Sequence, residues 1–132
     1  MQPPKSAEIF ETPNSKYWFD EEDMLMVVMK NAAAPELEEQ KRQTEEFLAK
    51  LDGKKICCII DFSNASYTPA SAESREYNNQ QVTKMFKAIA CVSHNVVTRM
   101  LAHLFLGFRT PPLPIKVFSN ETEAREWLRQ FQ

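Results

Sequence analysis

The sequence has few of the features that mark familiar binding and catalytic sites. Its 132 residues include only two glycines, and none of its segments forms a glycine-rich phosphate loop. It has no G-x-S-x-G turn, which carries the nucleophile of many hydrolases. Its longest apolar runs, residues 24–29 and 56–60, are too short to cross a bilayer. We therefore expect no nucleotide-binding loop, no hydrolase of this type and no membrane span.

Cysteine is also scarce, and the three cysteines argue against both a disulfide framework and a metal site. Cys57 and Cys58 are neighbours on a predicted strand, so their side chains point to opposite faces and cannot bind one metal together. Residues 1–8 lack a signal-peptide pattern, which favours reduced thiols in the cytoplasm. His94 and His103 have no suitably spaced partner ligands. We expect buried structural cysteines, no metal and no cofactor.

The charge and composition are those of an ordinary globular protein. The net charge is −2 and the basic residues are scattered along the chain, so no nucleic-acid partner is expected. Hydrophobic residues make up 43% of the chain and charged residues 26%, which is too apolar for a disordered protein. Because 132 residues is close to the commonest domain size, we predict one domain over residues 1–132, with residues 1–8 loosely ordered.

Hydrophobic periodicity predicts a hairpin followed by alternating helices and strands. Strands are expected at 9–12, 16–20, 24–30, 55–61, 88–93 and 115–118, and helices at 36–51, 72–87, 95–108 and after Asn120. Strands joined by a short turn pair antiparallel, whereas strand–helix–strand units form right-handed parallel crossovers. The predicted fold class is α/β, with a mixed, mostly parallel sheet, an antiparallel N-terminal hairpin and about four helices.

The polar stretch after the strand 55–61 is the candidate functional loop, because open α/β sheets bind ligands beyond the carboxyl ends of their strands. Its candidate residues are Asp61, Ser63, Asn64, Ser66, Tyr67 and Ser71. In one interpretation these side chains form turns with the nearby backbone. In the other they form a ligand or phosphorylation loop, since the amides at a helix start favour a phosphate. An enzyme using Asp61 or His94 would need a second titratable group within reach. None is recognised, so we predict that the chain is not an enzyme.

The segment 101–114 has more apolar residues than one face of a helix needs. Its candidate interface residues are Leu104, Phe105 and Phe108. This surplus either packs under the proline-containing loop or forms a contact patch for a partner or a second subunit, and we predict a homodimer. A pocket for a small apolar ligand such as a lipid, between the helix 95–108 and the sheet, is a further alternative.

The order of elements resembles the STAS, or anti-sigma factor antagonist, superfamily, and in particular its uncharacterised STAS-like bacterial branch. The resemblance covers most of the chain after residue 8. It is carried by six segments: Y-W-F-D-E-E-D-M-L-M-V-V-M (17–29), E-L-E-E-Q-K-R-Q-T-E-E-F-L (36–48), K-I-C-C-I-I-D-F-S (55–63), A-I-A-C-V-S (88–93), R-M-L-A-H-L-F-L (99–106) and V-F-S-N-E-T-E-A-R-E-W-L (117–128).

The resemblance implies a non-enzymatic regulatory or protein-interaction module with a protein partner. In that superfamily the second serine of an Asp-Ser-Ser-Gly motif is phosphorylated by a partner kinase. The matching stretch here is Pro69-Ala70-Ser71-Ala72, which places Ser71 at the acceptor position. The Asp, the first Ser and the Gly of the motif are replaced, so this chain departs from the pattern of kinase-controlled switching.

Overall fold

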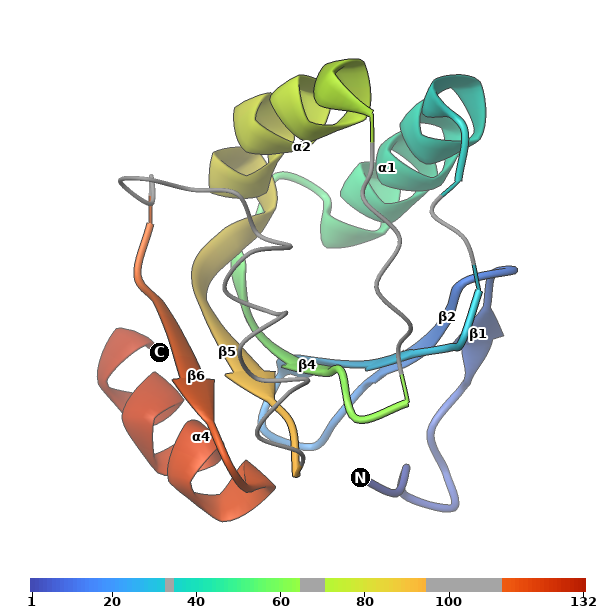
Figure 1. The fold of residues 1–132 in the computed structure, drawn as a ribbon. Helices are drawn as coiled ribbons and strands as arrows, with labels where there is room; N and C mark the ends of the chain where they lie inside the picture. Colours follow the sequence, from blue (N-terminus) through green and yellow to red (C-terminus); the bar gives the residue numbers. More distant parts are fainter. Residues whose placement is uncertain (33–34, 65–70, 95–112) are drawn as a thin grey trace.

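A computed structural model, which describes residues 1–32, 35–64, 71–94 and 113–132, contains a mixed sheet with helices on both faces (Figure 1). In chain order its elements are β1 (Phe10–Glu11), β2 (Ser15–Phe19), β3 (Met24–Met29), α1 (Leu37–Leu51), β4 (Ile56–Asp61), α2 (Ala72–Met85), β5 (Phe86–Val92), β6 (Ile115–Phe118), α4 (Glu121–Leu128) and the 3-10 turn η1 (Arg129–Phe131).

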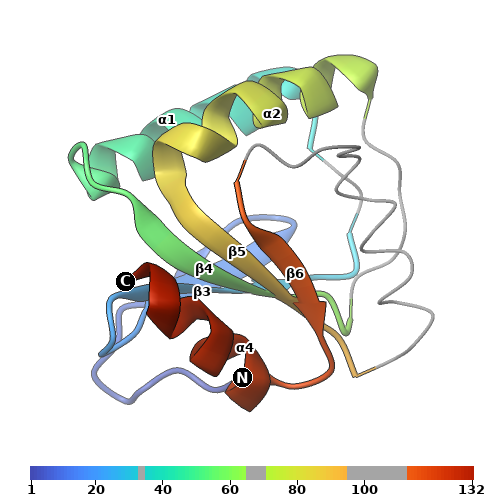
Figure 2. The same cartoon turned by 90° about the vertical axis from the view of Figure 1, so that its left-hand side faces the viewer.

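The strands lie side by side in the order of the sequence, from β1 to β6. The pairs β1–β2 and β2–β3 are antiparallel, and the three following pairs are parallel. The crossover helices α1 and α2 cover one face of the sheet, and α4 covers the other (Figure 2). The carboxyl ends of β3 and β4 therefore lead towards the N-termini of α1 and α2 at one edge, as in other parallel α/β sheets.

Asp20 stabilises the tight turn between β2 and β3. Its Oδ1 accepts hydrogen bonds from the backbone N–H groups of Glu22 and Met24, both at 2.9 Å. Asp23 adopts a left-handed conformation with φ of 58°, which aspartate tolerates better than most other residues. The acidic residues Asp20 and Asp23 thus stabilise the turn that joins the two strands of the hairpin.

The helix ends follow the chemistry of their sequences. After α1, Asp52 and Gly53 both adopt positive φ, of 50° and 80°, and glycine does so without the penalty of a Cβ atom. Asn120 caps α4, because its Oδ1 accepts a hydrogen bond from the Glu123 N–H at 2.9 Å. This cap begins α4 immediately after β6.

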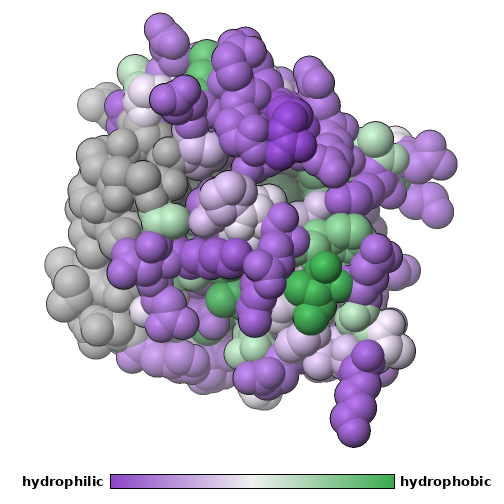
Figure 3. Space-filling view, turned by 90° about the vertical axis from the view of Figure 1, so that its right-hand side faces the viewer, coloured by the Kyte–Doolittle hydropathy of each residue, from purple (hydrophilic) through white to green (hydrophobic). Residues whose placement is uncertain are grey.

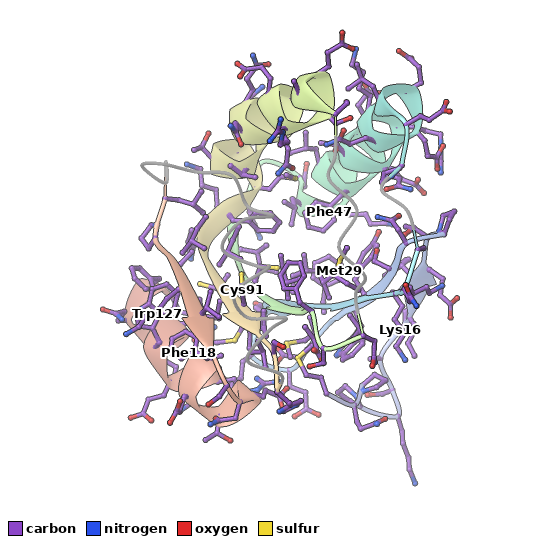
Figure 4. All side chains as sticks on the ribbon, in the orientation of Figure 1. Lys16, Met29, Phe47, Cys91, Phe118 and Trp127 are labelled. Carbon is purple, nitrogen blue, oxygen red and sulfur yellow. The ribbon has the colours of Figure 1, made fainter. Side chains whose placement is uncertain are left out.

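The two faces of the sheet form separate parts of the core. Beneath α1 and α2 the buried residues are Leu25, Phe47, Leu51, Cys58, Phe62, Val82, Met85, Ile89, Cys91 and Leu113. On the α4 side they are Trp18, Met24, Met26, Cys57, Ile59, Ala88, Ala90, Val92, Ala124 and Leu128. Figure 4 shows Phe47 between α1 and the sheet, with Trp127 beside Phe118 on the opposite side. The alternation of side chains along β4 and β5 fills both layers.

The predicted fold class is confirmed, and the largest differences from the expected boundaries lie where α2 meets β5. The helix expected at 72–87 ends at Met85, and β5 begins at Phe86 rather than at residue 88. Phe86 pairs with Ile56 and lies against Phe47, with ring centroids 6.0 Å apart, so tertiary contacts end the helix early. The strand expected to be covered on both faces is buried at residues 24–26 and only half-buried at residues 27–29. The helix predicted at 95–108 lies outside the described residues.

Near the start of the chain, Met1 and Ala7 pack against the cluster beneath α4. The surface over β1, β2 and α1 is mostly hydrophilic (Figure 3). Among the described residues, Ile9 is the one large apolar side chain that is exposed, at 44%. No helix in the described ranges has the length and apolar character that a membrane crossing requires.

Candidate functional site

The candidate site lies at the edge of the sheet where β4 and β5 end. Asp61 is the last residue of β4 and lies opposite Val92 of β5. The sheet pairing continues for one more residue, because the Phe62 N–H donates to the Val92 carbonyl at 2.9 Å. Asp61 and Ser93 are both buried, although they are polar. The edge therefore holds polar side chains in fixed positions just beyond the hydrophobic core.

Ser63 links the two chain segments that leave this edge. Its N–H donates to Asp61 Oδ1 at 2.9 Å, which forms a side-chain turn, and its Oγ accepts a hydrogen bond from the His94 N–H at 3.3 Å. Three predicted or considered residues are thus brought together: Asp61, Ser63 and His94. Their hydrogen bonds set the backbone path of the two loops. His94 is an exposed residue.

Ser71 is the N-cap of α2. Its Oγ accepts a hydrogen bond from the Ser74 N–H at 3.1 Å, and its own carbonyl accepts from the Arg75 N–H at 3.0 Å. A capping serine of this kind stabilises a helix without any regulatory role. The residue is also exposed, so its position at the start of a helix agrees with both interpretations of the loop.

A contact between α1 and α2 adds two residues that the sequence did not single out. Gln40 of α1 donates from Nε2 to the backbone carbonyl of Ser74, at 3.2 Å, and Ser74 itself is buried. The other atom of the amide, Gln40 Oε1, is buried and has no hydrogen-bond partner among the described residues. The only signal in the sequence was a glutamine in the first turns of an amphipathic helix, which is too common to identify a contact.

The remaining predicted residues are only partly covered. Asn64 is exposed and is the last residue described before the gap in the loop. Ser66 and Tyr67 lie outside the described residues. The predicted interface residues Leu104, Phe105 and Phe108 also lie outside them, so the structure gives no account of that interface.

The cysteines are free and buried, as expected for structural residues. Cys58 and Cys91 lie in the cluster beneath α1 and α2, whereas Cys57 faces α4. Burial raises the pKa of all three thiols, in the case of Cys91 to about 12, and the charge of Lys87 only partly opposes this effect on the pKa of Cys57. The thiols are held protonated and are poor nucleophiles or metal ligands at neutral pH.

The described part of the edge offers no set of ligands for a metal. Within residues 1–32, 35–64, 71–94 and 113–132, no group of three His, Cys, Asp or Glu side chains could hold one ion. The hydrogen bonds found for Asp61 and Ser63 in the same ranges go to backbone groups and not to a second titratable side chain. This arrangement can shape a loop and present exposed polar groups to a partner.

Comparison with known proteins supports the fold. The structure is similar to the crystal structure of an uncharacterized protein from the DUF3478 family, with a SpoIIAA-like fold, from Shewanella loihica PV-4. The two share 18% identity, and the match covers 97% of this chain and 98% of that one with a TM-score of 0.58. At this identity the likeness shows the fold alone, which is STAS-like as the sequence predicted. No functionally curated protein matches the chain.

The match to a family model rests on the sequence and covers nearly all the elements described above. The model describes a domain of unknown function, DUF7793, and it matches residues 17–132, which run from β2 to the end of the chain. The segment before β2, including β1, lies outside the match. Because the match spans far more than half of the chain, the protein belongs to the DUF7793 family.

Proposed function

We propose that this chain is a non-enzymatic protein-interaction module of STAS-like type, which binds a protein partner at the edge formed by the ends of β4 and β5. One observation carries the proposal: Ser63 is hydrogen-bonded both to the Asp61 side chain and to the His94 backbone. These hydrogen bonds hold together the first residues of the two loops that follow β4 and β5, so that they form one surface. Asn64 and His94 are exposed on this surface, beside the carboxyl edge where α/β folds place their sites.

The chemistry of the polar groups at this edge supports binding over catalysis. The carboxylate of Asp61 and the hydroxyls of Ser63 and Ser71 accept hydrogen bonds from backbone amides. Such bonds rigidify a surface, and a rigid surface binds a partner with a smaller entropy cost. The raised pKa values of the cysteines leave them unsuited to nucleophilic chemistry at neutral pH.

We further propose that phosphorylation of Ser71 modulates this binding. Its Oγ lies at the N-terminus of α2, where amide groups and the helix dipole favour a phosphate. The homodimer and the cytoplasmic location predicted from the sequence remain predictions. The alternative of an apolar ligand carrier depends on the predicted helix 95–108, which lies outside the described residues.

The proposal is tested by cross-linking capture of partners from an extract of the source cells with three baits. The first is the wild-type protein, and the second is the edge variant Asn64→Arg/His94→Glu, which changes two exposed residues. The third is a control variant, Thr122→Arg on α4 with Gln130→Glu on η1, which introduces the same two charges at other exposed positions.

We expect a partner that is enriched on the wild type and on the control but lost from the edge variant. Thermal melts of all three proteins confirm that they are folded. Either the absence of an enriched partner or equal capture by the edge variant would contradict the proposal. Phosphate on Ser71, measured by mass spectrometry of the protein isolated from the same cells, tests the regulatory part separately.

A further inference from the structure

Lysines are concentrated at the opposite edge of the sheet, where β4 and β5 begin. The segments 50–56 and 82–88 contain Lys50, Lys54, Lys55, Lys84 and Lys87 and a single carboxylate, Asp52. Five positive charges and one negative charge give these segments +4, whereas the whole chain carries −2. The rest of the chain therefore carries −6, so the molecule is strongly asymmetric in charge.

The fold brings the two segments together. α1 ends at Leu51 and a short turn leads into β4, while α2 passes directly into β5. The first residues of these two strands, Ile56 and Phe86, are paired in the sheet. Figure 2 shows the α1–β4 turn beside the junction of α2 and β5. We refer to Lys54, Lys55, Lys84 and Lys87 as the lysine edge.

The four side chains of the lysine edge belong to exposed residues. The ion pairs among the described residues involve Lys30, Arg42, Arg125 and Arg129 as cations, and none of the lysine edge. The neighbouring Lys50 is different, because its Nζ donates to the Tyr17 hydroxyl at 2.8 Å and lies 4.0 Å from the centre of the Phe10 ring. The charges of the lysine edge are thus available to a partner.

Helix electrostatics accounts for only part of this arrangement. Lys50 and Lys84 lie in the last turns of α1 and α2, where a positive charge stabilises the helix dipole. Lys54, Lys55 and Lys87 are outside the helices. In the pairing of β4 with β5, Ile56 lies opposite Phe86 and Cys57 lies opposite Ala88. Lys87 is therefore an extra residue at an irregularity in the strand pairing. Such irregularities change the direction of a strand and its side chains.

We propose that the lysine edge is a second interaction surface, and that its partner is an acidic segment of a protein. The two segments contain no arginine, and their single aromatic residue, Phe86, packs against Phe47. They therefore lack the guanidinium forks and stacking rings with which proteins usually hold nucleic acids. The exposed large apolar residue of the described chain, Ile9, is on the segment before β1, so no apolar anchor for a lipid surface accompanies the lysines.

The lysine edge lies at the opposite ends of β4 and β5 from the proposed binding surface, and the two surfaces can be tested independently. The test measures binding of a fluorescein-labelled peptide of ten glutamates by fluorescence anisotropy at low and high salt. Wild type is compared with Lys54→Glu/Lys87→Glu and with the control Lys5→Glu/Lys116→Glu. Both variants change the net charge by the same amount, and all four positions are exposed.

We expect the lysine-edge variant to weaken peptide binding at least tenfold, the control to weaken it less than twofold, and high salt to abolish it, since exposed charges are screened. Equal effects of the two variants would mean that only the net charge matters and would overturn the inference. Failure of the wild type to bind the peptide at low salt would do the same.

Three parallel measurements test the class of the partner. A ten-residue oligothymidine and vesicles containing 30% phosphatidylserine replace the peptide, and light scattering at low salt follows self-association. Tighter binding of either replacement, with the same dependence on Lys54 and Lys87, would assign the surface to nucleic acid or membrane and overturn the proposed partner. Self-association that the lysine-edge variant removes would assign the surface to a second copy of the chain and would also overturn the proposed partner.

Discussion

Removal of the Arg125 guanidinium should weaken the link between α4 and the turn that joins β2 and β3. Arg125 Nη1 donates to Asp20 Oδ2 at 2.6 Å, and the two side chains are only 23% and 6% exposed. Nη2 is 3.4 Å from Glu121 Oε1, and Nη1 is 3.8 Å from Glu22 Oε1. Burial lowers the pKa of Arg125, but the hydrogen bond and charge of Asp20, with the charges of Glu121 and Glu22, more than offset this effect and raise the pKa overall.

The unfolding free energy lost in Arg125→Ala depends on the hydrogen bonds that Asp20 keeps. A buried ion pair that loses one partner typically costs about 3–5 kcal/mol. Here Asp20 keeps two backbone N–H donors, from Glu22 and Met24, so its charge is not left unsatisfied. We therefore expect a loss of about 2 kcal/mol, close to the value of about 1.5–3 kcal/mol for one hydrogen bond between charged groups. At about 2.1 cal/mol/K of unfolding entropy per residue, a chain of 132 residues should lose about 7 °C in Tm.

The assay is urea unfolding followed by tryptophan fluorescence, with calorimetry for the Tm. Arg125→Met keeps the apolar stem and should lose nearly as much stability, because the charge is what it removes. Arg42→Ala is the matched control, since Arg42 pairs with Glu39 and Glu46 on the exposed face of α1 and should leave the midpoint unchanged. A loss at Arg125 no larger than that of the control would refute this reasoning.

Three further perturbations test other contacts. Ser71→Ala should cost about 1 kcal/mol by urea unfolding through loss of the α2 cap, while Ser71→Asp should retain the cap and the stability. Leu128→Ala removes a fully buried side chain of α4 and should lower the unfolding free energy by about 2–5 kcal/mol in the same assay. An exposed substitution such as Gln130→Ala should leave it nearly unchanged. Because the pKa of Cys91 is raised from 9.0 to about 12, its thiol ionises first in the unfolded chain, so stability should fall as the pH rises through that range. Cys91→Ala should reduce this slope by up to about 1.4 kcal/mol per pH unit, and an unchanged slope would contradict the assignment.

The fold could be predicted largely because its signals are local and periodic. The apolar runs of β3 and β4, the amphipathic α1 and the stop at Asp52-Gly53 fix a hairpin followed by a parallel crossover. The junction at Phe86 was missed because its residues suit a helix. Pairing with Ile56 and packing against Phe47 decide otherwise, and both contacts join segments far apart in the chain.

The positions of the candidate residues in the chain's helices and strands could be predicted, but their long-range hydrogen bonds could not. The position of Asp61 at the end of a buried strand and of Ser71 before a helix can be read from the sequence. The bond from His94 to Ser63 spans 31 residues, and the bond from Gln40 to Ser74 spans 34. Neither has a local pattern. The lysine edge was also missed, because the scattered lysines become neighbours only when β4 and β5 pair.

The proposed binding surface for a protein partner is the edge beyond β4 and β5. The most direct test is the dissociation constant of the captured partner, measured by biolayer interferometry with the wild type, Asn64→Arg/His94→Glu and Thr122→Arg/Gln130→Glu. We expect at least a tenfold weakening for the edge variant and less than a twofold change for the control. Equal affinity of the edge variant and the wild type would show that the partner does not bind at this edge.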